Sequence, residues 1–335
     1  MKILVTGASG FIGSFMVEEA LRRGMDTWAG VRASSSRAYL HDSRIRFAEL
    51  DLGRADVLEK QLLRQRDEAG PWDYVIHCAG ATKCRRTEDF DRINYEGTCH
   101  LVRLLASTGM MPRQFIFISS LSVYGPVHEQ DYAPISDHDT PRPDTAYGKS
   151  KLRAEQFLQA SPADFPYVIF RPTGVYGPRE RDYFLMAKSI DRHVDVAVGF
   201  RRQDLTFVFV KDLVQAVFRA IDRGVTRRAY FVSDGNVYAS RTFSDYIQRE
   251  LGRHAVAHLT LPLGLVRCVS AMAETVAGWA GRSSTLNRDK YNIMKQRNWR
   301  CDIRPLVDEL GYQPEYDLER GVRESIAWYK KEGWL

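Results

Sequence analysis

The first half of the chain alternates short apolar runs with longer stretches of helical character. The runs are rich in valine, isoleucine, phenylalanine and tyrosine, which favour strands, and the stretches between them carry apolar residues at helical spacing. This alternation is typical of strands joined by crossover helices, so we predict an α/β fold with a doubly wound parallel sheet. The predicted strands are Ile3–Val5, Thr27–Val31, Ile45–Glu49, Tyr74–His77, Phe115–Ile118 and Tyr167–Phe170, with Tyr230–Val232 expected to complete the sheet.

Two segments break this rhythm with prolines, short strands and long helices. They are residues 178–203 and 236–335, and we predict that they form a smaller α/β lobe that binds substrate. The parallel sheet then belongs to a domain of residues 1–177 and 204–235. Ligands of such sheets bind at the carboxyl ends of the strands, where we expect the functional site.

One helix of the second lobe, predicted between Leu261 and Ala280, has an apolar seam of its own. The seam interval alternates between four and three residues, as on one face of a helix, and charges at Arg267 and Glu274 interrupt the apolar length that a membrane span needs. We therefore predict no stable membrane insertion, and we expect the seam to be lobe core that partly lines an apolar substrate pocket. The seam residues are Leu265, Val269, Met272, Val276 and Trp279.

Composition narrows the possible classes of function. The chain has 335 residues, 44% of them hydrophobic, which is enough for one large domain and a smaller one. Its net charge is +6, but the basic residues occur as scattered pairs, such as Arg22-Arg23 and Arg201-Arg202. Nucleic-acid binding requires a concentrated basic stripe, so we expect no such partner, whereas an anionic substrate or cofactor fits the charge.

The cysteines indicate a reducing compartment. Cys78, Cys84, Cys99, Cys268 and Cys301 form no C-x-x-C pair and no metal-ligand spacing, so we predict free thiols and no bound metal. The first predicted strand begins so early that it leaves no room for a leader peptide. We therefore expect a cytoplasmic protein.

The segment from Met1 to Gly13 predicts a dinucleotide site of the Rossmann type. An apolar strand runs directly into Gly7, Gly10 and Gly13, and an amphipathic helix follows. Glycines at this spacing allow a sharp turn, close approach of the backbone to a pyrophosphate and tight packing of helix on sheet. The N–H groups at the helix start then face the phosphates.

The end of the second strand predicts a preference for NADP(H). An acidic residue there would accept from ribose hydroxyls, but this chain has Arg32, then Ser34–Ser36 and Arg37. A 2′-phosphate fits these residues, although Arg32 could instead be a solvated loop residue. Asp51 and Leu52, at the end of the third strand, could contact the adenine. His77 is expected to be structural.

Tyr147 and Lys151 predict hydride-transfer chemistry. Residues four apart lie on one face of a helix. An ammonium beside a phenol stabilises the phenolate, so we expect Lys151 to lower the pKa of Tyr147, normally about 10, and to reach ribose hydroxyls. Ser120, from a serine cluster at the end of the fifth strand, would hold the substrate oxygen.

Together these motifs resemble the extended short-chain dehydrogenase/reductase family over essentially the whole chain. That family includes nucleotide-sugar epimerases and dehydratases, 3β-hydroxysteroid dehydrogenases and dihydroflavonol reductases. The matching segments are Thr6–Gly13, Asp51-Leu52, His77–Gly80, Asn94–Thr98, Ser119–Gly125, Tyr147–Lys151, Arg171–Pro178 and Val210–Asp212.

The resemblance implies specific roles for individual residues. Ser120, Tyr147 and Lys151 match the catalytic residues of the family. The implied cofactor contacts are Gly7, Ser9, Gly10, Phe11, Ile12, Gly13, Arg32, Arg37, Asp51, Leu52, Cys78, Ala79, Gly80, Asn94, Ser119, Tyr147, Lys151, Pro172, Thr173 and Val175. The implied substrate contacts are Thr82, Ser122, Tyr124, Tyr176 and Leu205.

Departures from the nucleotide-sugar branch decide which substrate we expect. Alignment on Val210–Asp212 places Leu205 where that branch has an arginine on the diphosphate, and the C-terminal stretch, including Gly281-Arg282 and Leu286, resembles the steroid and flavonoid branch. We therefore predict an NADP(H)-dependent oxidoreductase, with NAD(H) possible, that interconverts a secondary alcohol and a ketone on a steroid-like or polyphenol-like substrate. A nucleotide-sugar epimerase or dehydratase with retained cofactor is the first alternative, and a non-catalytic dinucleotide-binding scaffold is the second. The family implies a homodimer.

Overall fold

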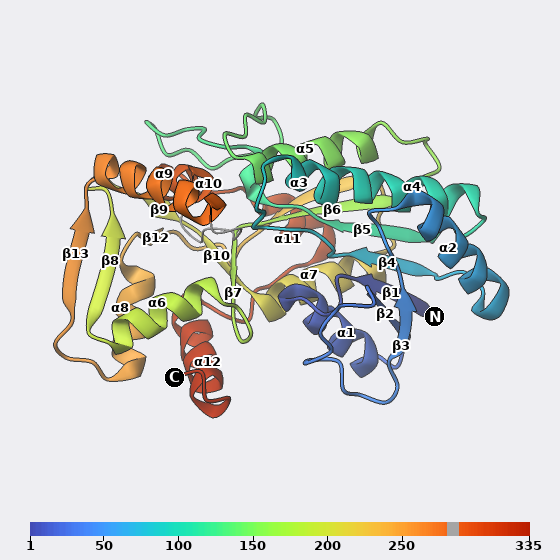
Figure 1. Cartoon of the computed structure of the whole chain (residues 1–335), viewed down its shortest axis with the longest axis horizontal. Helices are drawn as coiled ribbons and strands as arrows, with labels where there is room; N and C mark the ends of the chain where they lie inside the picture. Colours follow the sequence, from blue (N-terminus) through green and yellow to red (C-terminus); the bar gives the residue numbers. More distant parts are fainter. Residues whose placement is uncertain (280–287) are drawn as a thin grey trace. The chain divides into compact units, whose positions relative to one another are not determined.

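The computed structural model describes residues 1–279 and 288–335 of the chain (Figure 1). Its main feature is a seven-stranded sheet, with order β11-β6-β5-β4-β1-β2-β3 and parallel pairing from β6 through β3. Every strand predicted from the sequence is present, so the predicted doubly wound α/β fold is confirmed. The strands are β1 (Lys2–Thr6), β2 (Asp26–Val31), β3 (Arg46–Glu49), β4 (Tyr74–His77), β5 (Gln114–Ile118), β6 (Tyr167–Pro172) and β11 (Arg228–Val232).

Helices cover the sheet because its central strands are apolar toward both sides. All residues of β5 and β6 are buried, as in parallel sheets that are packed on both faces. Figure 1 shows α1 and α7 on one face and α4 and α5 on the other. The helices around the sheet are α1 (Phe11–Arg22), α2 (Ala55–Ala69), α3 (Glu88–Phe90), the π-helix η1 (Asp91–Glu96), α4 (Gly97–Ser107), α5 (Ala146–Gln159) and α7 (Val210–Arg223).

The chain divides into two compact units. Unit 1 comprises residues 1–120, 146–171 and 214–230, and unit 2 comprises residues 121–145, 172–213 and 231–335. The division predicted from the sequence assigned 121–145, 172–177, 204–213 and 231–235 to the sheet domain. The difference arises because β7 (Gly174–Tyr176) and β10 (Phe207–Phe209) pair with each other in a separate sheet, and because Ile135 bridges to Cys301 of the C-terminal segment.

Unit 2 is assembled from small sheets and helices around an aromatic core. β7 pairs with β10, β9 with β12 and β8 with β13. The remaining strands are β8 (Val194–Val198), β9 (Asp204–Leu205), β12 (Tyr238–Ala239) and β13 (Ala257–Leu261). The helices are the 3-10 turn η2 (Leu121–Val123), α6 (Asp182–Asp191), α8 (Thr242–Leu251), α9 (Leu263–Trp279), α10 (Arg288–Lys295), α11 (Arg304–Leu310) and α12 (Leu318–Lys331).

Two tyrosines predicted as substrate contacts belong to the core of unit 2. The ring centroid of Tyr176 lies 5.2 Å from that of Phe243, and a Cβ at Gly321 would come within 2.1 Å of the Tyr176 hydroxyl. Tyr124 packs on Phe231 at 5.2 Å. Both tyrosines are almost fully buried. Their rings are packed against protein side chains, and the substrate contacts predicted for them stay predictions.

Helix α9 turns a different face to the protein than its apolar seam predicts. Leu265, Val269 and Met272 are 50%, 39% and 64% exposed, whereas Val266 and Ser270 are buried. The buried positions lie one residue along from the seam, a rotation of about 100° around the helix. The prediction that the seam is core is therefore wrong for these positions. The side chains of Val276 and Trp279, and residues Gly281, Arg282 and Leu286, lie outside what the structure describes.

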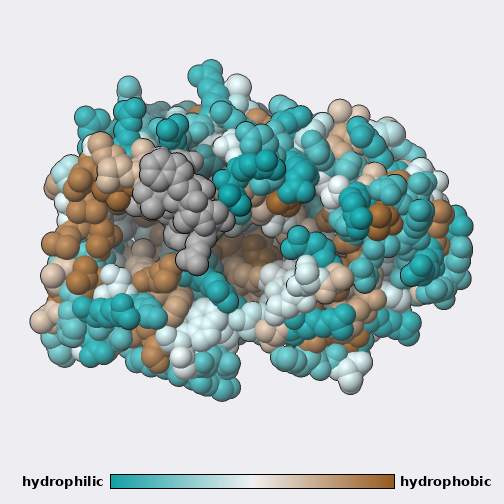
Figure 2. Space-filling view, viewed as in Figure 1, coloured by the Kyte–Doolittle hydropathy of each residue, from teal (hydrophilic) through white to brown (hydrophobic). Residues whose placement is uncertain are grey.

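The exposed seam is part of a larger apolar surface of unit 2. Val196 of β8 and Leu259 of β13 are 46% and 50% exposed, and Figure 2 shows hydrophobic surface over β13 and the start of α9. Among the described residues, no helix is both long and apolar enough to cross a membrane.

Candidate functional site

The turn after β1 requires its glycines for steric reasons. Gly7 has a φ of +65°, and a Cβ there would lie 2.7 Å from the backbone nitrogen of Ala79. A Cβ at Gly13 would lie 2.2 Å from the carbonyl oxygen of Gly7. The Gly10 N–H donates to the same oxygen at 2.9 Å and caps α1. The turn therefore brings the start of α1 close to the loop after β4 and leaves open backbone in front of it.

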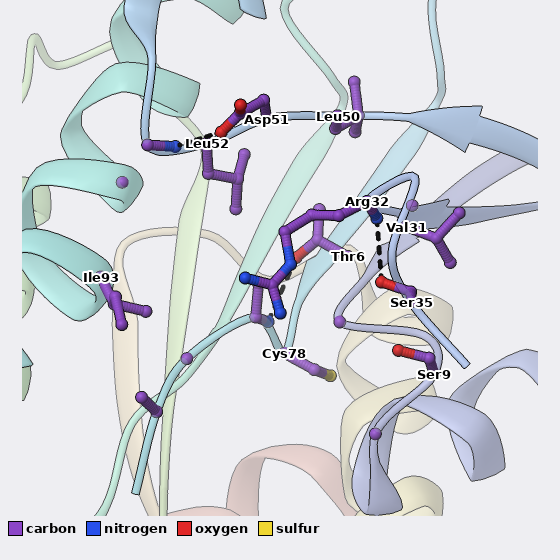
Figure 3. A pocket seen from close by; sticks show the side chains of 18 of the residues that line it. Thr6, Ser9, Val31, Arg32, Ser35, Leu50, Asp51, Leu52, Cys78 and Ile93 are labelled. Atoms are coloured by element: carbon purple, nitrogen blue, oxygen red, sulfur yellow. Dashed lines mark hydrogen bonds between the residues drawn. The ribbon is translucent and has the colours of Figure 1, made fainter. Parts of the chain in front are cut away.

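A cavity of about 420 Å³ lies over this turn at the carboxyl ends of the strands of unit 1 (Figure 3). It contains nine of the twenty predicted cofactor contacts, namely Gly7, Ser9, Gly10, Arg32, Asp51, Leu52, Cys78, Ala79 and Gly80. Prediction from sequence missed Thr6, Gly30, Val31, Leu50, Gly53, Ala81, Arg92, Ile93 and Gly97, which also line it. Most of these flank predicted residues, so strand-end position was the signal that could have identified them.

Arg32 gives the cavity a positive side. Its side chain is directed over the cavity, and its backbone N–H donates to the Ser35 hydroxyl at 3.0 Å (Figure 3). Asp51 is the one carboxylate in the described lining, and it pairs with Arg54 at 2.8 Å. Arg32 forms no ion pair with the residues that the structure describes. Arg37 is not part of the lining, and its guanidinium stacks at 4.0 Å on the Phe47 ring. Its predicted contact with the cofactor stays a prediction.

Asn94 fixes the loop that follows β4. Its side-chain oxygen accepts from the Ala81 N–H at 2.7 Å, and its side-chain nitrogen donates to the Ala81 carbonyl and to the Ser150 hydroxyl, each at 3.0 Å. Asn94 lies in the π-helix η1, a type of helix often found at functional sites. Predicted as a cofactor contact, Asn94 instead connects a wall of the cavity to α5.

His77 is structural, as the sequence predicts. Its two ring nitrogens bond the hydroxyls of Thr6 at 2.7 Å and Thr98 at 3.0 Å. Burial is the main cause that lowers its pKa to about 3, so the ring is neutral. The neighbouring Cys78 thiol is neutral as well, since burial raises its pKa to about 12.

Ser120, Tyr147 and Lys151 meet at the end of β5. Tyr147 and Lys151 lie one turn apart on α5, and Tyr147 is hydrogen-bonded to Ser120. The Lys151 ammonium donates to the Ile118 carbonyl at 2.8 Å. A Cβ at Gly80 would lie 3.3 Å from the Lys151 nitrogen, so this ammonium reaches the cavity wall.

The electrostatics of this cluster differ from the expectation. Burial raises the pKa of Tyr147 to about 12, and the Ser120 hydrogen bond opposes that rise. Burial also lowers the pKa of Lys151 to about 8, while Cys78 and Glu155 oppose the change. The pKa of Tyr147 is thus raised by burial and not lowered, in contrast to the expectation. Tyr147 is therefore a neutral proton donor.

A buried ion pair beside the cluster was missed from the sequence. Arg171 pairs with Glu155 at 2.6 Å, and both side chains are almost fully buried. The Ser119 hydroxyl donates to the same carboxylate. Ser119 was predicted to contact the cofactor, but its hydroxyl instead helps to hold α5 against the ends of β5 and β6.

The remaining predicted contacts are divided between the two units. In unit 1, Phe11, Ile12 and Gly13 begin α1, and Thr82 is exposed. In unit 2, Leu205 packs at the edge of the aromatic core, while Ser122 and Val175 are half-buried and Pro172 and Thr173 are buried. No described group of His, Cys, Asp and Glu could hold a metal ion.

Several known proteins are similar to this chain in sequence or in fold. An uncharacterized UDP-glucose epimerase of Bacillus subtilis is 29% identical, with 98% of each chain covered. A ceramide reductase of Caulobacter vibrioides is 23% identical over 99% of this chain and 96% of its own. The crystal structure of a Thermus thermophilus UDP-glucose 4-epimerase in complex with NAD has the same fold, with a TM-score of 0.77 at 20% identity over 98% and 99% of the two chains.

The model of the NAD dependent epimerase/dehydratase family matches residues 3–233, which include the glycine turn, the cavity over it and the Ser120–Tyr147–Lys151 cluster. The match supports the resemblance to extended short-chain dehydrogenases and leaves the 3β-hydroxysteroid branch a prediction. By this match, the chain belongs to the NAD dependent epimerase/dehydratase family.

Proposed function

We propose that the chain binds a nicotinamide dinucleotide in the cavity of unit 1 and uses it to interconvert a secondary alcohol and a ketone on a nucleotide sugar. The observation that carries the proposal is the cluster of Ser120, Tyr147 and Lys151, in which a neutral phenol lies beside a hydroxyl and one helical turn from an ammonium. A binding-only scaffold has no need for this set of proton-transferring groups.

The residues of the cavity fit such a cofactor. A Cβ at Gly7 or Gly13 would collide with backbone, so the turn keeps its N–H groups open toward a pyrophosphate. Arg32 offers a charge that suits a 2′-phosphate. When bound, the nicotinamide ring supplies or accepts hydride.

The chain's own groups would handle the proton. In the reductive direction, the Tyr147 hydroxyl donates its proton to the carbonyl oxygen as that oxygen gains negative charge, and Ser120 holds the same oxygen. In the oxidative direction, the phenolate removes the alcohol proton. Lys151, held at the Ile118 carbonyl, would help to hold the bound cofactor through its positive charge.

Nucleotide sugars are the substrate class that the relatives favour. The Bacillus subtilis and Thermus thermophilus proteins are both named for UDP-glucose epimerases. This class replaces the steroid-like or polyphenol-like substrate as our first choice.

A second candidate is an NADP(H)-dependent reductase of an apolar carbonyl compound. Arg32 in the cofactor cavity, the apolar Leu205 and the similarity to a ceramide reductase favour it. In that case the cofactor is exchanged in every cycle. An epimerase keeps its cofactor through both hydride steps. The preference for NADP(H), the homodimer and the cytoplasmic location remain predictions.

The test is a product assay with two arms. In the first, the purified chain is incubated with UDP-glucose or dTDP-glucose and either NAD⁺ or NADP⁺, and the sugars are separated by chromatography. In the second, NADPH consumption is followed with long-chain, steroid and polyphenol ketones. Tyr147→Phe is the control in both arms. We expect a new nucleotide sugar that Tyr147→Phe fails to form; turnover in the second arm alone would overturn the nucleotide-sugar proposal.

A further inference from the structure

Unit 2 exposes several large apolar side chains next to one another, on a surface that we call the apolar face. Strands β8 and β13 pair in parallel, and their register places Val196 beside Leu259. The chain turns after β8 at Gly199, whose N–H donates to the Leu261 carbonyl at 2.9 Å. Phe200 follows this turn and, at 75%, is the most exposed large apolar residue that the structure describes. The apolar face consists of Val196, Phe200, Leu259, Leu265, Val269 and Met272.

Helix α9 contributes to this face because its apolar seam points outward. The opposite side of the helix, with Arg267 and Ala271, borders a cavity of about 590 Å³ that is also lined by Lys295 of α10. A Cβ at Gly199 would lie 3.6 Å from the Leu263 side chain, so the start of α9 adjoins the turn before Phe200. Figure 2 shows hydrophobic surface over both β13 and the start of α9. Two strands and a helix therefore form the apolar face together.

The charges around the apolar face are positive. From residue 252 to residue 273 the sequence has no Asp or Glu, and between residues 192 and 203 it has only Asp195. Asp195 is buried, and its carboxylate lies 3.1 Å from the His258 ring. Arg192 and Arg201, beyond the two ends of β8, are exposed and form no ion pair with the described residues. The face thus combines an apolar surface with unpaired cations.

We propose that the apolar face binds the surface of a membrane that contains anionic lipids. Contiguous apolar surface of this kind marks a site of contact with a protein or a membrane. Apolar side chains gain free energy at the boundary between headgroups and acyl chains, and arginines gain free energy near anionic headgroups. The attachment is reversible and superficial, because no described helix is both long and apolar enough to cross a membrane.

The charge of the face favours a membrane over a second copy of the chain. In a two-fold dimer the same surface of each copy meets the other. Arg192 and Arg201 of both copies would then approach one another without an exposed carboxylate from these segments to compensate them. An anionic lipid surface supplies that compensation. The inference goes beyond the proposed function and does not depend on it.

Flotation of the full chain with lipid vesicles tests the proposal without any turnover. One set of vesicles contains phosphatidylcholine alone, and the other contains equal parts of phosphatidylcholine and phosphatidylglycerol. The native chain is compared with Phe200→Ser and Arg201→Glu. The matched controls are Val307→Ser, at an exposed position of α11, and Lys331→Glu, at an exposed position at the end of α12. Light scattering without lipid measures the oligomeric state.

We expect the native chain to float with the anionic vesicles, and added salt to release it. Phe200→Ser and Arg201→Glu should each weaken the binding roughly tenfold, whereas both controls should bind like the native chain. Absence of binding, equal binding to the two kinds of vesicle, or native binding by either variant of the face would overturn the proposal. A lipid-free dimer that Phe200→Ser converts to a monomer, with no vesicle binding, would overturn it in favour of a second copy.

Discussion

The cavity of unit 1 and the cavity of unit 2 are built from different parts of the chain. Backbone and small residues form much of the first, and Gly7, Gly10 and Gly80 make its walls. Long side chains from two helices form the second, among them Arg267 and Lys295. A backbone site depends on which residues lack a side chain, which a sequence states directly. A side-chain site depends on how helices are turned, which tertiary packing decides.

The largest effect, a loss of turnover, is expected at Tyr147, because the proposed proton transfer in unit 1 depends on this one side chain. Tyr147→Phe removes the transferable proton and should lower turnover by about 10²- to 10⁴-fold, while dinucleotide affinity and thermal stability stay close to native. Steady-state rates and cofactor titrations measure both. Tyr74→Phe is the control, because the Tyr74 hydroxyl only approaches the Met1 sulfur at 3.8 Å. Near-native turnover in Tyr147→Phe would remove the catalytic assignment.

A substitution of Arg171 tests whether the stability of unit 1 depends on a buried ion pair as well as on its backbone. Arg171→Met leaves the Glu155 carboxylate buried without its partner, and breaking such a pair typically costs about 3–5 kcal/mol of unfolding free energy. Urea denaturation measures the loss. Adding Glu155→Gln to the same chain should recover part of it. A single variant as stable as the native chain would mean that the pair does not hold α5 in place.

Arg32 is one of two arginines in the lining of the first cavity, and unlike Arg92, which pairs with Asp89, it forms no ion pair with the described residues. Arg32→Ala should weaken NADPH binding by roughly tenfold to a hundredfold, because a charge-assisted contact to the 2′-phosphate is lost, and should leave NADH binding unchanged. Arg37→Ala is a close control, since Arg37 stacks on Phe47 away from the lining. Fluorescence titration gives both affinities. Equal losses in the two variants would contradict the NADP(H) preference.

The smallest effect is expected from the titration of Lys151. Because burial lowers the pKa of Lys151 to about 8, the ammonium loses its charge as pH rises from 7 to 9. The cofactor contact that we propose for Lys151 should weaken with that loss. Dinucleotide affinity should fall severalfold over this interval. Lys151→Arg keeps its charge at these pH values, so its affinity should vary less with pH. A native profile that stays flat between pH 7 and 9 would argue against the contact.

Sequence reasoning succeeded where the backbone determines the structure. A side chain at Gly7 or Gly13 would collide with neighbouring backbone, so only glycine fits at these positions. The parallel sheet brings the carboxyl ends of its strands to one edge. It failed where packing decides. The seam of α9 has helical period, but periodicity does not state which face meets the protein, and the structure buries Val266 and Ser270 instead.

The buried pair of Glu155 and Arg171 was beyond sequence reasoning for another reason. The two residues come from α5 and β6, and nothing in their spacing indicates that they meet. The sequence likewise offered no reason to group Arg267, Arg288 and Lys295, which α9 and α10 bring together around one cavity.

The central claim, that the cavity of unit 1 holds a nicotinamide dinucleotide, is tested most directly by equilibrium titration of the full chain with NADPH and NADH. Gly10→Leu is the informative variant, because its side chain would enter the cavity at the start of α1. The account predicts saturable binding of at least one dinucleotide by the native chain and its loss in Gly10→Leu. Absence of binding in the native chain, or equal binding in Gly10→Leu, would contradict it.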